Sequence, residues 1–550
     1  MDRISVLARR QRIKNLEQWT IYAILVEAFF LALSPTVAAT AVVFGMITWF
    51  LRSRIDSHYK IRSLPFDVPV TIFLLIGAAS VFLSSARSLE LIYNYCSLVG
   101  MYGLTYFLVG QTCRTPAQIK QVAQALGASA ILVVLCGFFQ FAFGVDVADV
   151  KWTDPEAFPE LRKRIFSTLE NPNVLAGYLD VFICLTLGLL TKVERRSQKL
   201  VLIVAVVMLA ACLTMTYSRG AFLAMAVVIS VYGVLKDWRV LILFATVTVL
   251  IACNDPTFVD RITSAFTMGD TSEGVRVGIW VSTIAMITDH PFAGIGWGAY
   301  QFVYPQYNYY VADADIIIYH AHNLYLNYAA EIGIVGALAF FWYFFGTMFM
   351  AFGAGELGAA DSTFLERVEK FFAGSPFTRY LAELTRTVNK RLAAFAEALI
   401  NLFGKRQPVA RKLKKFQRPQ SDLVHHDELR FGGKRRKHPD DDAEVAAVDS
   451  VPVAGEKVSA KIIRLNPDDV DDAPDDTDSA IDFSGVTKLD DQKFLDGLKL
   501  GIGLAFLSMA LNGFTDDLLF NIPSSMLMWM LGALGAALNS IRNEELVMRN

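Results

Sequence analysis

The stretch Tyr319-His320-Ala321-His322-Asn323 stands where a polar segment gives way to an apolar run that continues to about residue 353. Such a run is long enough to cross a bilayer as a helix, which requires about 20 apolar residues. Two of the seven histidines of the chain lie in this stretch. We therefore expect it to join a membrane span to a polar site at the membrane surface.

The composition of the whole chain agrees with a membrane protein. Hydrophobic residues make up 54% and charged residues 19%, and the mean hydropathy is +0.40. These values exclude an ordinary soluble protein, in which the fractions are about 45–50% and about 25%. We predict an all-α integral membrane protein with about twelve transmembrane helices. They are expected at residues 17–34, 36–51, 66–84, 91–110, 119–143, 172–190, 200–217, 220–235, 239–253, 323–353, 497–514 and 522–541.

Lysine and arginine residues gather in every second loop, which predicts that both termini are cytoplasmic. The transmembrane region would then span 1–354 and carry a long loop at 254–322 on the outer, non-cytoplasmic side of the membrane. A cytoplasmic insert is expected at 355–496, followed by the last two transmembrane helices at 497–550.

The insert is predicted to have two parts. Apolar residues at helical spacing indicate an amphipathic helix over about 378–403. A basic and then an acidic segment follow, and their composition is typical of disorder. The basic part could contact anionic lipid, whereas nucleic acid is not an expected partner because no fold presents these charges.

His322 is the first candidate for chemistry. It would lie at the positive end of the predicted helix dipole, which disfavours the imidazolium form and keeps a neutral base available. His320 lies two residues earlier and is a candidate for binding substrate. The alternative is a pair of interfacial histidines that only make hydrogen bonds within the loop.

Three polar residues of the following helix support a site. Asn323, Asn327 and Glu331 are spaced by four and would form one stripe about two turns deep. Polar groups at that depth usually face a cavity or the interior of a helix bundle. We consider all three as substrate-binding candidates, with hydrogen bonding between helices as the alternative.

Two arginines are expected on the same outer side. Arg219 opens a membrane span, and Arg276 lies in a predicted interfacial helix, where Trp280 shares its face as a further substrate-binding candidate. The guanidinium fork suits phosphate oxygens. Snorkelling to lipid phosphates is the alternative for either arginine alone.

Three other motifs have simpler interpretations. The segment Gly294-Ile295-Gly296-Trp297-Gly298 lacks the βαβ context of a nucleotide site and indicates a tight turn against a ligand or a helix. Asn171-Pro172-Asn173 is interpreted as a helix cap. Asp516 and Asp517 could hold a cation, but two adjacent carboxylates are more simply solvated.

Together these motifs resemble the O-antigen ligase and polymerase superfamily of bacterial inner-membrane enzymes. Roughly residues 165–350 are covered, and the order and spacing make the resemblance specific. The matching motifs are Ser167-Thr168 to Asn173, Tyr217-Ser218-Arg219-Gly220, Arg276 to Trp280, residues 289–296, and His320-Ala321-His322-Asn323 to Gly333.

The resemblance implies a GT-C-like glycosyltransferase that needs no metal and no other cofactor. Its donor would be a glycan on undecaprenyl pyrophosphate at the periplasmic face of the inner membrane, and its acceptor a lipid A–core hydroxyl. Arg219 and Arg276 would neutralise the leaving pyrophosphate, and His322 would be the catalytic base. Membrane lipids are expected partners, and envelope-biosynthesis proteins are candidate partners of the insert.

Two related activities fit the same motifs: polymerisation of O-antigen or exopolysaccharide repeat units, and protein O-glycosylation. Outside this class, a polytopic transporter or flippase would place charges across the membrane midplane. Here the arginines and histidines gather at one edge, which favours the enzyme.

Overall fold

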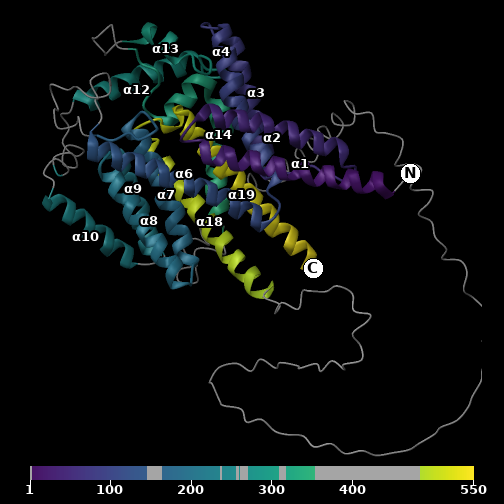
Figure 1. Ribbon diagram of the computed structural model, residues 1–550. Coiled ribbons are helices and arrows are strands. Elements are labelled where there is room, and N and C mark those ends of the chain that lie inside the picture. Colours follow the sequence, from purple (N-terminus) through teal and green to yellow (C-terminus); the bar gives the residue numbers. More distant parts are fainter. Residues whose placement is uncertain are drawn as a thin grey trace, which may run out of the picture. The chain divides into compact units, whose positions relative to one another are not determined.

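The computed structural model describes residues 3–144, 164–235, 238–254, 259, 271–308, 317–353 and 484–549. Within these ranges every regular element is a helix (Figure 1). Seven of these helices are long and apolar enough to cross a membrane, and three shorter apolar helices accompany them. The predicted all-α membrane fold is confirmed, whereas the number of twelve spans stays a prediction.

The N-terminal part consists of α1 (Arg3–Phe30), α2 (Pro35–Ile55), α3 (Asp67–Leu83), α4 (Leu89–Asn94), the π-helix η1 (Tyr95–Val99), α5 (Gly100–Thr112) and α6 (Pro116–Phe143). Thr115 and Gln118 form a capping box that begins α6. The side chain of Glu27 in α1 is fully buried, and Thr105 of α5 donates a hydrogen bond to it at 2.5 Å. A hydrogen bond between helices thus provides a partner for one oxygen of this buried side chain in an apolar bundle.

The middle part carries the elements that position the site. These are α7 (Pro172–Lys192), α8 (Arg196–Thr214), α9 (Arg219–Leu235), α10 (Trp238–Asn254), α12 (Thr271–Asp289), α13 (Tyr300–Val303), the 3-10 helix η3 (Tyr304–Tyr307) and α14 (Leu324–Ala351). α14 packs on α3 and α12.

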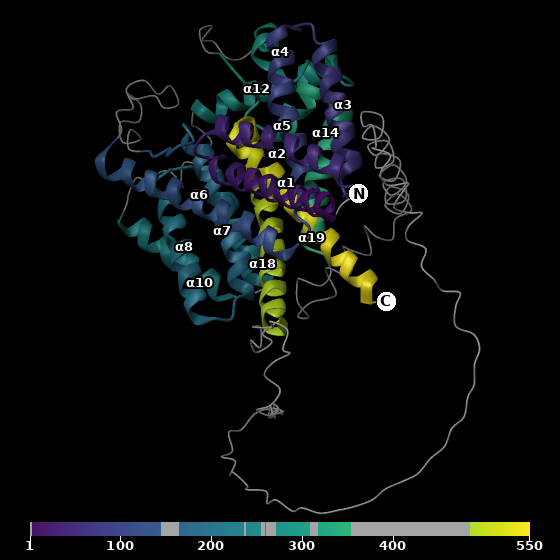
Figure 2. The same ribbon diagram turned by 45° about the vertical axis from the view of Figure 1, so that its right-hand side comes forward.

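The C-terminal part consists of α18 (Ser484–Asn512), the 3-10 helix η4 (Leu518–Phe520) and α19 (Ile522–Arg549). α18 runs alongside α7 in both views (Figure 1 and Figure 2), and Asn512 of α18 donates to the buried Asp180 of α7 at 3.0 Å. In the core, Trp529 of α19 stacks on Tyr343 of α14 with ring centroids 4.5 Å apart. The C-terminal helices are therefore integral to the bundle that the earlier helices form.

Each expected span coincides with a helix, and the span at 91–110 coincides with the continuous series α4, η1 and α5. α18 begins at Ser484, upstream of the start predicted at residue 497. The chain divides into one unit of residues 1–404 and 486–550 and a second of residues 405–485. The amphipathic helix and the charged segments predicted for the insert lie outside the described residues.

Candidate functional site

The histidine stretch lies directly before α14. Asn323 is the N-cap of this helix, because its Oδ1 accepts hydrogen bonds from the backbone N–H groups of Tyr325 and Leu326, both at 3.0 Å. His322 has a φ of +48°, a left-handed conformation that costs a non-glycine residue about 1–3 kcal/mol. Its backbone N–H donates to Nδ1 of His320 at 3.1 Å. A strained residue that keeps an imidazole where glycine would be relaxed is typical of a functional position.

Three contacts hold this stretch on its neighbours. Oδ1 of Asn327 accepts from the N–H of Ala321 at 3.1 Å, and the indole N–H of Trp280 donates to the Ala321 carbonyl oxygen at 3.1 Å. Nδ2 of Asn323 donates to the carbonyl oxygen of Phe514 at 3.1 Å. The residues predicted to bind substrate thus use these polar atoms to fix the loop between α12, α14 and the segment after α18.

The glycine-rich turn at residues 291–296 packs against α14, the helix that follows the histidine stretch. α14 is interrupted at Gly333, where φ is +70°, and the turn 291–296 satisfies the backbone groups that the break releases. The hydrogen bonds run from Ile295 to Ala330 at 2.8 Å, from Gly296 to Glu331 at 2.9 Å, and from Ile334 to Pro291 at 2.8 Å. A Cβ on Gly333 would lie 2.2 Å from the carbonyl oxygen of Phe292. The expected tight turn is therefore confirmed, and it packs against a helix.

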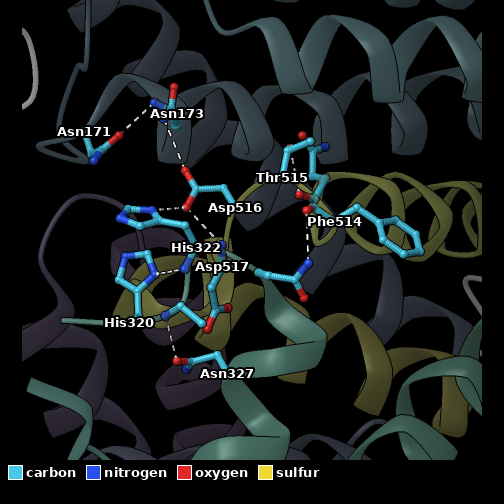
Figure 3. Close-up of polar contacts among 12 residues, drawn as sticks. Asn171, Asn173, His320, His322, Asn327, Phe514, Thr515, Asp516 and Asp517 are labelled. Carbon is cyan, nitrogen blue, oxygen red and sulfur yellow. Dashed lines mark hydrogen bonds and ion pairs between the residues drawn. The ribbon is translucent and has the colours of Figure 1, made fainter. Parts of the chain in front are cut away.

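Asp516 is the main partner of the catalytic candidate. Its Oδ1 lies 3.1 Å from Nδ1 of His322 and accepts a hydrogen bond from the N–H of Asp517 at 3.0 Å (Figure 3). Its Oδ2 accepts from Nδ2 of Asn173, at the start of α7, at 3.2 Å. The ring of His320 stacks against Phe520 with centroids 4.6 Å apart. Segments far apart in the sequence thus meet around one carboxylate.

The electrostatics of this cluster define the protonation states. Burial alone would raise the pKa of Asp516, but the hydrogen bond from His322 and the charges of His322, His320 and Arg276 hold it well below its usual range. Burial, helped by the neighbouring His322, lowers the pKa of His320 to about 3. At neutral pH Asp516 is therefore ionised and His320 is neutral. Since an ionised carboxylate only accepts hydrogen bonds, Nδ1 of His322 donates to Asp516, so the neutral form of this ring has its lone pair on Nε2.

The two arginines lie on elements that border the two loops of this cluster, α12 beside the histidine stretch and α9 beside the segment of Asp516. The positive charge of Arg276 acts on both His320 and Asp516, so this guanidinium is within electrostatic reach of the cluster. Arg219 is the first residue of α9. A Cβ on its neighbour Gly220 would lie 2.5 Å from Oγ1 of Thr515, so α9 begins beside the loop that carries Asp516.

A third segment joins the site from the side of α7. Nη2 of the buried Arg164 donates to Oδ1 of Asn173 at 2.7 Å, and its Nε donates to the carbonyl oxygen of Thr216 at 2.7 Å. The non-glycine residues with positive φ in the described ranges are Ser167, Glu170, Tyr217 and His322. All four belong to the segments that converge here, as strained residues at functional sites commonly do.

The contact of Asp516 with His322, the part played by Arg164 and the side-chain contact of Asn173 were not predicted from the sequence. Asp516 and Asp517 were expected to be solvated, but the structure contradicts this: the side chain of Asp516 is 17% exposed, and Asp517 is 4% exposed. Burial and the charge of Asp516 raise the pKa of Asp517 to about 7. A usable signal was the spacing by four of Ser508, Asn512 and Asp516, which parallels the stripe that begins at Asn323.

The same cluster contains ligand types that bind metals. The donor atoms of His320, His322 and Asp516 all lie within 4.8 Å of one another, and imidazole and carboxylate are common zinc ligands. The positive charge of Arg276 opposes a divalent cation at this position. The hydrogen bond between His322 and Asp516 already joins two of the three residues, so the arrangement suits proton transfer.

Comparison with known proteins finds a family model that is similar to the central part of the chain. Residues 177–341 match the family model described as O-antigen ligase, and no curated protein matches the chain. The matched segment contains Arg219, Arg276 and the histidine stretch. Arg164, Asn173 and Asp516 lie outside it.

Proposed function

We propose that this chain, whose residues 177–341 match the O-antigen ligase family model, is a membrane glycosyltransferase that moves a glycan from undecaprenyl pyrophosphate to an acceptor hydroxyl. The reaction takes place at the periplasmic face of the inner membrane and inverts the anomeric carbon. The observation that supports this most directly is the hydrogen bond of His322 to an ionised Asp516 beside Arg276.

His322 is the general base in this proposal and acts through Nε2. This nitrogen takes the proton of the acceptor hydroxyl while the hydroxyl oxygen attacks the anomeric carbon. Asp516 holds the ring by Nδ1 and stabilises the imidazolium that forms. A positioned base of this kind contributes typically ~10²–10⁴-fold to the rate.

The arginines act on the leaving group. The bond from the anomeric carbon to the phosphate oxygen breaks with its electron pair on the pyrophosphate, which gains negative charge. The guanidinium groups of Arg276 and Arg219 donate hydrogen bonds to the pyrophosphate and neutralise this charge. The stabilisation is greatest in the transition state. Because the positive charge belongs to the chain, the proposal requires no metal.

The test of the proposed base is His322→Ala in a strain that lacks the chromosomal copy. We expect transfer to fall at least about 100-fold, while the purified variant still binds inorganic pyrophosphate. His290→Ala is the matched control, because His290 is exposed at the end of α12 and should leave transfer unchanged. Full activity of His322→Ala at a normal protein level would remove the base assignment.

The acceptor that we propose first is the lipid A–core. The rivals within the family are a polymerase, whose acceptor is another lipid-linked repeat unit, and a protein O-oligosaccharyltransferase. Mass analysis of surface glycans from a deletion strain separates them. Loss of all capped lipopolysaccharide supports the ligase, capping by single repeat units supports the polymerase, and loss of glycan from proteins alone supports the third activity.

A further inference from the structure

We propose that Asn173 is a positioning residue of the transfer reaction: its side-chain amide, oriented by Arg164, holds the second oxygen of Asp516 and so fixes the carboxylate that orients His322. This inference rests on the proposed function and adds a structural requirement to it. Asn173 and Arg164 both lie outside the segment that matches the family.

The orientation of the amide is determined by its partners. A guanidinium group only donates hydrogen bonds, so Nη2 of Arg164, at 2.7 Å, requires the oxygen of Asn173 to face it. The amide nitrogen must then point the other way, where Oδ2 of Asp516 lies at 3.2 Å. An asparagine that could otherwise turn over is locked in the orientation that donates to the carboxylate.

Asp516 is thereby held through both of its oxygens. Oδ1 faces Nδ1 of His322 and the N–H of Asp517, and Oδ2 faces Asn173. Without the Asn173 contact, the carboxylate could rotate about its bond to Cβ and present a different oxygen, or none, to the imidazole. In metal sites, comparable outer contacts that orient a ligand change affinity or activity by about 10–100-fold, and we take this as the scale for Asp516.

Helix capping does not account for the Asn173 side chain. The cap of α7 is Asn171, whose Oδ1 accepts from the backbone N–H of Asn173 at 2.8 Å. The two asparagines around Pro172 therefore have different roles: Asn171 caps the helix, and the side chain of Asn173 donates to Asp516 (Figure 3). Asn171 consequently provides a matched control at the same helix end.

Arg164 also connects Asn173 to the loop before Arg219. Its Nε donates to the carbonyl oxygen of Thr216 at 2.7 Å, three residues before Arg219. The buried guanidinium of Arg164 therefore contacts both Asn173, which donates to Asp516, and the segment before Arg219, a proposed pyrophosphate ligand. Lysine at this position has a single ammonium group and could not make both contacts in the same geometry.

The experiment measures steady-state transfer by the purified full chain, with lipid-linked glycan extracted from a strain that lacks this protein. For Asn173→Ala we expect kcat to fall about tenfold or more. KM and the affinity for inorganic pyrophosphate should stay unchanged, because Asn173 contacts neither substrate in this proposal. Asn171→Ala should retain kcat within about twofold per folded molecule, since it loses only a cap. If Asn173→Ala does not accumulate, Arg164→Lys is the second variant. The same loss of kcat is expected, and because Arg164 also contacts Thr216 before Arg219, we expect its affinity for pyrophosphate to fall as well.

An exchange variant separates positioning from a structural role. N173D/D516N restores a hydrogen bond between the two positions but leaves His322 beside an amide. We expect it to be as slow as D516N alone. Recovery towards the wild-type kcat would show that only the contact between the helices matters, and it would overturn the inference.

The inference and the proposed function fail in different ways. Full activity of His322→Ala removes the base, and the positioning role fails with it. An inactive His322→Ala together with wild-type kcat in Asn173→Ala or Arg164→Lys removes the positioning role alone.

Discussion

Asp516→Asn is the most informative single substitution, because it preserves the shape of the side chain and removes its charge. In the wild-type chain the carboxylate accepts from Nδ1 of His322 at 3.1 Å. An amide can instead turn its NH₂ group towards Nδ1, which then has to be the unprotonated nitrogen. The proton moves to Nε2, and the lone pair that would accept the proton of the hydroxyl is lost.

The size of the effect can be worked from the geometry. Two unit charges about 4 Å apart interact by about 4 kcal/mol at an effective dielectric constant of about 20. The side chain of His322 is 35% exposed, so we discount this for solvent screening to about 2 kcal/mol. That corresponds to about 30-fold in rate, and the wrong tautomer adds to it. In the serine protease triad the same change costs about 10⁴-fold, so we expect a loss between these values.

The assay is single-turnover transfer by purified protein with donor bound in advance, which reports the chemical step and not binding. The rate constant should fall by at least about 30-fold in Asp516→Asn, while the affinity for inorganic pyrophosphate stays within about twofold. A wild-type rate constant would refute the orienting role of Asp516. Loss of pyrophosphate binding instead would show that Asp516 serves the donor site.

Three further substitutions test other contacts. Gly333→Ala places a Cβ at a φ of +70°, 2.2 Å from the Phe292 carbonyl oxygen. We expect thermal unfolding to show a fold destabilised by about 2–3 kcal/mol. The control is Gly100→Ala, whose Cβ would have nothing within 4 Å and which should not lower the Tm. Trp280→Phe removes the N–H that holds the histidine loop and should lower kcat about tenfold at an unchanged protein level; a wild-type kcat would contradict this contact. Asp517 has its pKa raised to about 7 by burial, so the wild-type chain loses stability as the pH rises from about 4 to about 7. Asp517→Asn lacks this loss, and the Tm difference between variant and wild type should grow from pH 5 to pH 8; a constant difference would count against the buried carboxyl.

Apolar length was sufficient to predict where the helices lie. A chain in lipid must satisfy its backbone within the helix, so a long apolar run leaves little choice, and the span expected at 172–190 is α7, Pro172–Lys192. The break at Gly333 could not be predicted in this way. It depends on the turn 291–296, which supplies hydrogen-bond partners for the released backbone groups. The sequence around Gly333 does not predict that contact.

The candidate site was predicted in part. The motifs led to His322, which lies within hydrogen-bond distance of Asp516, and to Arg276, whose positive charge acts on the same carboxylate. Asp516 was missed because two adjacent acidic residues in a short loop look solvated until the packing of η4 is known. Asn173 was included in the capping motif because no local pattern in the sequence shows that its side chain reaches Asp516.

The central claim is that Arg276, Arg219 and His322 act on one lipid-linked diphosphate. The most direct measurement is an experimental structure of the full chain with polyprenyl pyrophosphate bound. We predict phosphate oxygens within hydrogen-bond distance of both guanidinium groups, with Nε2 of His322 facing the side from which an acceptor would approach. A diphosphate bound away from these arginines, or a His322 Nε2 turned from the bound lipid, would contradict the account.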